Sequence, residues 1–170
     1  MKTLYLITGP AGVGKSTISK LIAKNLEKSC LIEGDDIYAM VVGSYQSAWK
    51  EGNHLEFFWK NSLDLIENSL DFGYDVVFNY IIKKSQLGEI VDRFKEKDVK
   101  IKFVLLLTDE KTLIERDKTR HLDCQMGERV VVLLKSFVEE NFDPKYILDS
   151  TSKTEEQVLS EIMQSDRFEI

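Results

Sequence analysis

The chain has 170 residues, 43% hydrophobic and 31% charged, which is ordinary for a globular protein and long enough to bury a core without disulfide or metal staples. Its net charge is −6, with 29 acidic against 23 basic residues, which argues against a broad electrostatic footprint on nucleic acid or anionic lipid. No apolar stretch approaches the roughly 18 residues that a membrane-spanning helix needs, so we expect a cytoplasmic protein without a membrane partner.

The first predicted elements are a strand, a glycine-rich loop and a helix, in that order. Residues 3–8 form a nearly continuous apolar run, typical of a buried strand in a parallel sheet. The sequence from Gly9 to Thr17 then fills every fixed position of the phosphate-binding motif G-x-x-x-x-G-K-S/T. Apolar residues recur at helical spacing after it, from Ile18 to Leu26. This order predicts a nucleoside triphosphate site.

The residue types of this loop suit a triphosphate for physical reasons. Glycines let the backbone wrap an anion and turn several N–H groups toward it. Lys15 supplies a positive charge for the β- and γ-phosphates, so we expect it to be catalytic, and the Ser16 hydroxyl is expected to be a ligand for magnesium. We expect the nucleotide to be bound by Gly9, Pro10, Ala11, Gly12, Val13, Gly14, Lys15, Ser16 and Thr17.

Strand and helix patterns alternate along the rest of the chain. Further strands are predicted over residues 31–33, 75–79, 101–107 and 146–148, and helices around 55–70, 87–94, 113–120, 130–138 and 154–162. Alternation of this kind predicts an α/β fold: a three-layer α/β/α sandwich of the P-loop NTPase type. It would be one domain over 1–170, with a five-stranded parallel sheet, helices on both faces, and ligands at the carboxyl edge of the strands.

Two aspartates follow the second predicted strand. Asp35 and Asp36 should emerge at the sheet edge that carries the phosphate loop. A carboxylate there can accept the proton of an attacking hydroxyl or hold magnesium through water. Asp36 could instead cap a following helix. We expect Asp35 to be catalytic or metal-binding.

Two arginines lie four residues apart on the helix after the fourth strand. The planar guanidinium groups of Arg116 and Arg120 suit spread phosphate charge, although neighbouring acidic residues could pair with them. Residues 116–129 form a largely irregular stretch that could act as a small lid, and Arg129 could reach the site when it closes. We predict that Arg120 is catalytic.

Other polar and aromatic residues give weaker signals. Asn79 ends the third strand, where phosphate-loop enzymes often carry an aspartate for magnesium, and Lys83 and Lys84 follow on the same edge. The least periodic region, 36–54, is the expected acceptor-binding region. It contains Tyr38, Tyr45, Trp49 and His54.

The phosphate loop, the run Gly34-Asp35-Asp36, the pair Arg116 and Arg120, and the run 149–151 together resemble the small P-loop kinases. The gluconate kinase, shikimate kinase and chloramphenicol phosphotransferase branch is the most similar, with gluconate kinases nearest. Gluconate kinases carry a Gly-Asp pair after the second strand, as here, but read Cys-Ser-Ala-Leu-Lys where this chain has Asn-Tyr-Ile-Ile-Lys at 79–83.

The resemblance implies ATP and Mg²⁺ as cofactors and a small-molecule acceptor. By likeness to adenylate kinase-like enzymes, Arg116 would lie beside the base and Arg120 at the phosphates. Residues Thr151, Ser152 and Lys153 would border the adenine. Nothing in the sequence decides between a monomer and a homodimer.

The sequence therefore favours an ATP-dependent kinase that phosphorylates a hydroxyl of a small polar metabolite, such as gluconate or a related sugar acid. One alternative is a nucleoside, nucleotide or nucleic-acid-end kinase. Another is a nucleotide-binding sensor or switch without a metabolic substrate, although the guanine-reading motif Asn-Lys-x-Asp is absent from the sequence.

Overall fold

The computed structural model describes residues 1–43 and 53–170. The strands are β1 (Lys2–Thr8), β2 (Ser29–Glu33), β3 (Asp75–Asn79), β4 (Val99–Leu107) and β5 (Ile147–Asp149). The α-helices are α1 (Lys15–Asn25), α2 (Gly34–Ala39), α3 (Asn53–Asp71), α4 (Lys84–Phe94), α5 (Glu110–Lys118), α6 (Arg129–Glu139) and α7 (Glu155–Gln164). Two short 3₁₀ turns occupy Leu122–Cys124 and Pro144–Tyr146.

The five strands form one parallel sheet, as the alternation predicted, and their order in the sheet is β2-β3-β1-β4-β5. Parallel pairing brings the carboxyl ends of the strands to one edge. In this register Asn79 of β3 lies opposite Ile7 of β1 on one side and Glu33 of β2 on the other. The phosphate loop, which follows β1, therefore shares its edge with both polar residues.

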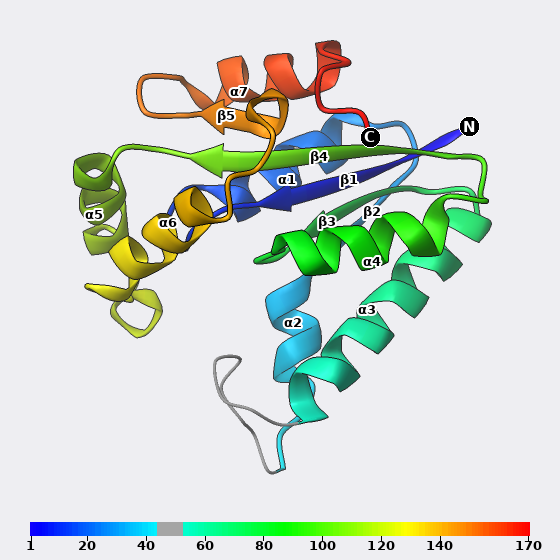
Figure 1. The fold of residues 1–170 in the computed structure, drawn as a ribbon, viewed down its shortest axis with the longest axis horizontal. Coiled ribbons are helices and arrows are strands. Elements are labelled where there is room, and N and C mark those ends of the chain that lie inside the picture. Colours follow the sequence, from blue (N-terminus) through cyan, green and yellow to red (C-terminus); the bar gives the residue numbers. More distant parts are fainter. Residues whose placement is uncertain (44–52) are drawn as a thin grey trace.

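Helices cover both faces of the sheet, and alternate residues of each strand enter different cores. Leu4 and Leu6 of β1 pack toward α3 and α4, whereas Tyr5 and Ile7 pack toward α1 and α7. Figure 1 shows α3 and α4 on one side of the strands and α7 on the other. The apolar runs in the sequence are thus explained by burial on both faces.

The structure departs from the sequence-based expectation just before the fifth strand and just after the second. The fifth strand begins at Ile147 rather than at residue 146, because a 3₁₀ turn capped by the Asp143 carboxylate and started by Pro144 takes up the preceding residues. A short helix, α2, follows β2 directly, where the periodicity is weakest. Helix α7 starts with a capping box formed by Thr154 and Gln157.

The described ranges do not include residues 44–52. Tyr45 and Trp49, which belong to the expected acceptor-binding region, therefore lie outside the described residues. Within the ranges that are described, no helix combines the length and the apolar character needed to span a membrane.

Candidate functional site

The loop after β1 has the backbone geometry of an anion cradle. Gly9, Gly12 and Gly14 adopt φ values of 142°, 83° and 107°, in the region that side-chain-bearing residues rarely occupy. A Cβ atom at Gly9 would also come within 2.2 Å of the carbonyl oxygen of Leu106. Glycine is therefore required at position 9 both by the dihedral angle and by the close approach of β4.

Helix α1 begins at Lys15, immediately behind this cradle. Its N-cap, Gly14, makes no side-chain capping hydrogen bond. The first N–H groups of a helix lack intrahelical partners and carry the positive end of the helix dipole. The start of α1 is therefore suited to bind phosphate oxygens, as the motif predicts.

Lys15 lies across the cradle. Its ammonium donates a hydrogen bond to the carbonyl of Pro10 (3.1 Å). Burial lowers the pKa of Lys15 to about 8, the Asp35 carboxylate opposes this shift, and the Arg120 guanidinium adds to it. The charge of Lys15 therefore responds to groups on both sides of the site.

A polar cluster lies beside the first turn of α1. The Ser16 hydroxyl donates to Glu33 Oε2 (3.1 Å) and accepts from the Asn79 side-chain amide (3.0 Å), which also donates to Glu33 Oε2. The other carboxylate oxygen, Oε1, is buried without a hydrogen bond, and the Lys20 ammonium lies 3.8 Å from it. Glu33 thus presents a carboxylate to the hydroxyl that the motif assigns to the metal.

Glu33 is a site residue that the sequence-based interpretation missed. In the sequence, Glu33 is marked only as the last residue of the second predicted strand. The signal that could have found it is positional, because the strand that ends in Glu33 pairs with the one that ends in Asn79. A carboxylate and a hydroxyl are ligand types that Mg²⁺ prefers, so Glu33 and Ser16 fit the expected metal, and the Asn79 amide holds both of them by hydrogen bonds.

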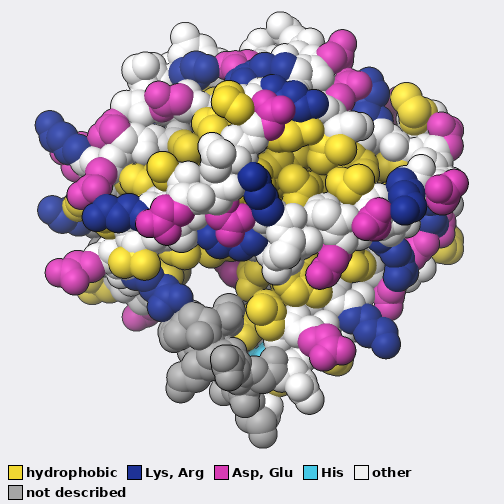
Figure 2. All heavy atoms as spheres, viewed as in Figure 1, with side chains coloured by type: hydrophobic (Ala, Val, Ile, Leu, Met, Phe, Trp, Pro, Cys, Tyr) yellow, Lys and Arg dark blue, Asp and Glu magenta, His cyan; other side chains and the backbone are white. Residues whose placement is uncertain are grey.

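A cavity of about 660 Å³ opens above the cradle. Residues of the phosphate loop and α1 line it, together with Asp35, Asn79 and Arg120. Figure 2 shows the surface hollowed on this face of the molecule. The predicted catalytic residues Lys15, Asp35 and Arg120 are thus brought together around one cavity. Asp36 is exposed and does not line it.

The stretch after α5 is tied down by Asp117, which is 3% exposed. Its carboxylate accepts from the backbone N–H groups of Met126 and Gly127 and from Arg120 (3.2 Å). Burial opposes the charge of Asp117, but these hydrogen bonds outweigh it and lower the pKa of its carboxyl group. Arg129, at the start of α6, lines the cavity beyond this stretch.

The residues expected near the adenine occupy a separate corner. The Arg116 guanidinium donates to the carbonyl of Val13 (3.1 Å) and to the carbonyl and hydroxyl of Ser150, so it joins the phosphate loop to the segment after β5. The Thr151 hydroxyl donates to the Asp149 carboxylate (2.6 Å). Arg116, Thr151 and Ser152 do not line the cavity, and their contact with a base stays a prediction.

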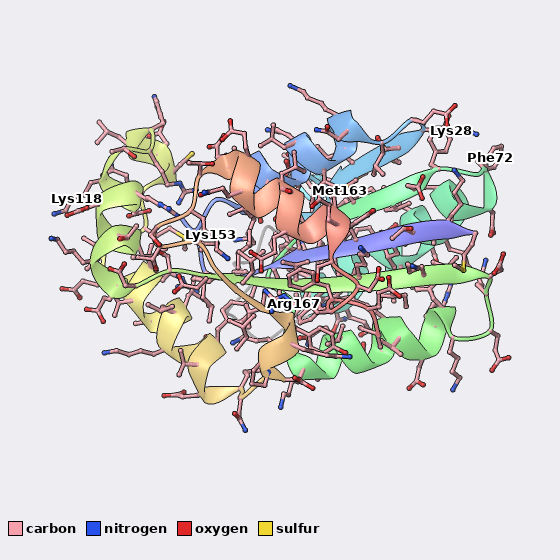
Figure 3. All side chains as sticks on the ribbon, turned by 90° about the horizontal axis from the view of Figure 1, so that it is seen from above. Lys28, Phe72, Lys118, Lys153, Met163 and Arg167 are labelled. Atoms are coloured by element: carbon pink, nitrogen blue, oxygen red, sulfur yellow. The ribbon has the colours of Figure 1, made fainter. Side chains whose placement is uncertain are left out.

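Lys153, which is expected to border the adenine, forms an ion pair with Glu161 of α7. Figure 3 labels Lys153 and Arg167, which flank α7 before its start and after its end. Both side chains pair with the carboxylate of Glu161. Lys153 is therefore held at the face of α7 by an ion pair.

The lysines after β3 bind to α6 and its end. The Lys83 ammonium donates to the Ser136 hydroxyl (2.8 Å) and lies 3.6 Å from the Glu140 carboxylate. The Lys84 ammonium donates to the carbonyl of Asn141 (2.7 Å), and Lys84 does not line the cavity. Both lysines thus tie the loop after β3 to this part of the chain.

Of the aromatic candidates in the described residues, Tyr38 lines the cavity. His54 is buried and its ring stacks on the Tyr38 ring, with ring centroids 4.6 Å apart. Asp109 caps the start of α5, because its carboxylate accepts a hydrogen bond from the backbone N–H of Thr112 (2.9 Å).

A protein family model described as an AAA domain matches residues 4–140. Over 166 residues, the chain is 32% identical to a Thermococcus kodakarensis protein provisionally named adenylate kinase; the match covers 94% of this chain and 83% of that one.

Two solved structures are similar in fold. A sugar kinase from a Janibacter species gives a TM-score of 0.72 at 14% identity, covering 95% of this chain and 92% of that one. A gluconokinase from Sinorhizobium meliloti gives 0.65 at 21% identity, covering 94% and 89%. The predicted fold class is thereby confirmed.

Proposed function

The chain belongs to the family described by the AAA domain model, with a kinase-type P-loop fold, and from this premise we propose that it transfers the γ-phosphate of ATP to a hydroxyl of a small polar metabolite. The observation that carries the proposal is that Lys15, Asp35 and Arg120 line one cavity. A cation pair for the transferred phosphate and a carboxylate for an incoming hydroxyl are what such a transfer requires.

On the nucleotide side, the residues bind and orient the triphosphate. The N–H groups of the cradle and of the first turn of α1 hold the phosphate oxygens. Lys15 and Arg120 place positive charge where negative charge spreads over the transferred phosphoryl group. Arg120 then exchanges its contact with Asp117 for one with the nucleotide.

On the acceptor side, Asp35 positions and deprotonates the hydroxyl. The hydroxyl proton passes to the Asp35 carboxylate, and the acceptor oxygen bonds to the γ-phosphorus. The bond from that phosphorus to the oxygen bridging it to the β-phosphate breaks, which leaves ADP. Asp35 is exposed to the cavity, so it has the access that this role needs.

Magnesium would be held by Ser16, with Glu33 and Asn79 around it, and would neutralise phosphate charge when bound. The contact between Ser16 and Glu33 favours Glu33 over Asp35 for the metal. Asp35 then remains available for the acceptor.

Substitutions of the neighbouring residues Asp35 and Asp36 test the proposed role of Asp35 at the acceptor hydroxyl. Asp35→Asn should lower the turnover number by at least 100-fold while changing the ATP dissociation constant by less than threefold. Asp36→Asn is the matched control, because Asp36 is exposed on the same turn without lining the cavity, and it should leave both values unchanged. An equal loss of turnover and ATP affinity in Asp35→Asn would remove Asp35 from the acceptor role.

A second candidate function is phosphate transfer to a nucleoside monophosphate. The provisional name of the Thermococcus kodakarensis relative favours it. Conversion of AMP to ADP, with no ester formed on any alcohol, would establish this second function. Binding of ATP without transfer to any acceptor would instead support a sensor role.

A further inference from the structure

One part of the cavity has apolar walls that the phosphate-transfer chemistry does not use. Leu55 and Trp59 stand four residues apart on α3, and Ile81 follows β3. Leu133 of α6 and Met126 also line the cavity. Leu55, Trp59 and Ile81 pack against the core under α3 and α4, whereas Met126 and Leu133 pack against the core on the other face of the sheet. All five side chains are only partly buried, so apolar surface is left at the cavity wall.

The Trp59 ring is held by its neighbours. It meets Phe58 edge-on at 5.0 Å between centroids, Tyr80 at 5.7 Å and Phe78 at 6.1 Å. Tyr80 in turn lies so close to Gly34 that a Cβ there would come within 2.6 Å of the ring. A ring fixed in this way forms a preorganised flat surface that loses little freedom when a ligand packs on it.

Polar side chains around the same space have other partners. The Asn79 amide donates to Ser16 and Glu33, and the Lys83 ammonium donates to Ser136. The side-chain oxygen of Gln86 accepts from the backbone N–H of Lys83. An open-chain polyol would have to place several hydroxyl groups against these walls and leave hydrogen bonds unmade. Apolar walls favour an acceptor with a flat apolar part instead.

We propose that the acceptor is an alcohol carried by a planar ring, with the ring packed on Trp59 and Leu55 and the hydroxyl beside Asp35. This inference rests on the phosphotransferase function proposed above and names its substrate class. Nucleosides and aryl alcohols share this chemistry. A sugar acid such as gluconate does not.

The experiment compares ring-bearing and ring-free alcohols as acceptors of phosphate from ATP, using adenosine, thymidine and 2-phenylethanol against gluconate and glycerol. We expect ester formation with at least one ring-bearing alcohol, at a kcat/KM at least 10-fold above that for gluconate. A preference for the nucleosides over 2-phenylethanol identifies the ring as a base, and the reverse identifies an aryl group. Equal or better use of gluconate overturns the ring inference and leaves the phosphotransferase function intact. Formation of ADP from AMP with no ester on any alcohol overturns both.

Variants of α3 tie the preference to the proposed surface. Trp59→Ala should lower kcat/KM for the preferred ring-bearing alcohol by about 10- to 100-fold. Trp59→Phe, which keeps an aromatic ring, should retain most of the native kcat/KM. Phe57→Ala is the matched control, because Phe57 lies on the same helix, is 51% exposed and does not line the cavity. An unchanged kcat/KM in Trp59→Ala, or an equal loss in Phe57→Ala, contradicts the proposed ring contact.

Discussion

The lowered pKa of Lys15 predicts a specific pH dependence of ATP binding. The pKa lies near 8 in the ligand-free protein, mainly because burial disfavours the charged form. Bound phosphates favour the ammonium and must raise this pKa. ATP affinity should therefore be full below about pH 8 and decline as the pH rises above that value.

The magnitude follows from proton linkage. If the phosphates return the pKa of Lys15 from about 8 to the ordinary lysine value of about 10.4, the coupling is on the order of 3 kcal/mol. Between pH 7 and pH 9 the ATP affinity should fall about 10-fold, and binding at pH 8 should take up about half a proton. Unfolded lysine holds its proton up to about pH 10.4, so the free energy of unfolding of the ligand-free protein should rise with pH between about 8 and 10.4.

Isothermal titration calorimetry measures both quantities. Titrations at pH 7, 8 and 9 give the affinities, and pairs of buffers with different ionisation enthalpies give the proton uptake. The terminal phosphate of ATP is already ionised over this window, because its own pKa is about 6. Lys15→Arg is the matched control, since it keeps the charge but does not titrate, and its affinity should stay level.

Two results would contradict the titration of Lys15 as the cause of the pH dependence. One is an ATP affinity that is the same at pH 7 and pH 9 with no proton uptake at pH 8. The other is an equally steep decline in Lys15→Arg, which would assign the pH dependence to another group.

Three further predictions concern the metal, the loop and the segment after α5. Glu33→Gln should raise the dissociation constant of Mn²⁺ from the complex of protein and ATP about 10- to 100-fold, as measured by electron paramagnetic resonance. The affinity for ATP without metal should not fall. An unchanged Mn²⁺ affinity would remove Glu33 from the metal site. Gly9→Ala should lower the free energy of unfolding in urea by about 1–3 kcal/mol. Gly88→Ala on α4 should not lower it in this way, because the added Cβ meets nothing there. Equal effects of the two variants would contradict the close approach of β4 to Gly9. Asp117→Asn should lower the unfolding free energy by about 1–3 kcal/mol and speed amide hydrogen exchange at Gly127, and unaltered exchange there would show that the carboxylate does not hold this stretch.

The fold could be predicted from the sequence because its signals were local and consistent. The apolar run of β1, the motif from Gly9 and the helical spacing after Ser16 lie next to one another in the chain. The alternation of strand and helix patterns predicted a five-stranded parallel sheet, which the structure confirms, but it did not give the order of the strands in the sheet. Helix α2 escaped because six residues with two buried apolar side chains, Ile37 and Tyr38, are too short to display a period.

The site could be predicted only where a motif fixes it. Glu33 and Trp59 gave no motif, since one ends a strand and the other sits in an amphipathic helix. Their roles depend on strand register and on the packing of α3, which are long-range properties. Arg116 stands in a recognisable pair with Arg120, but its hydrogen bonds to Val13 and Ser150 could not be foreseen from spacing.

The most direct test of the account follows the fate of the γ-phosphate. The protein is incubated with ATP, Mg²⁺, AMP and the alcohol panel, and the products are resolved by ³¹P nuclear magnetic resonance. The account predicts a phosphate ester formed in equal amount to ADP, and its loss in Asp35→Asn but not in Asp36→Asn. Release of inorganic phosphate alone, or transfer only to AMP, would contradict it.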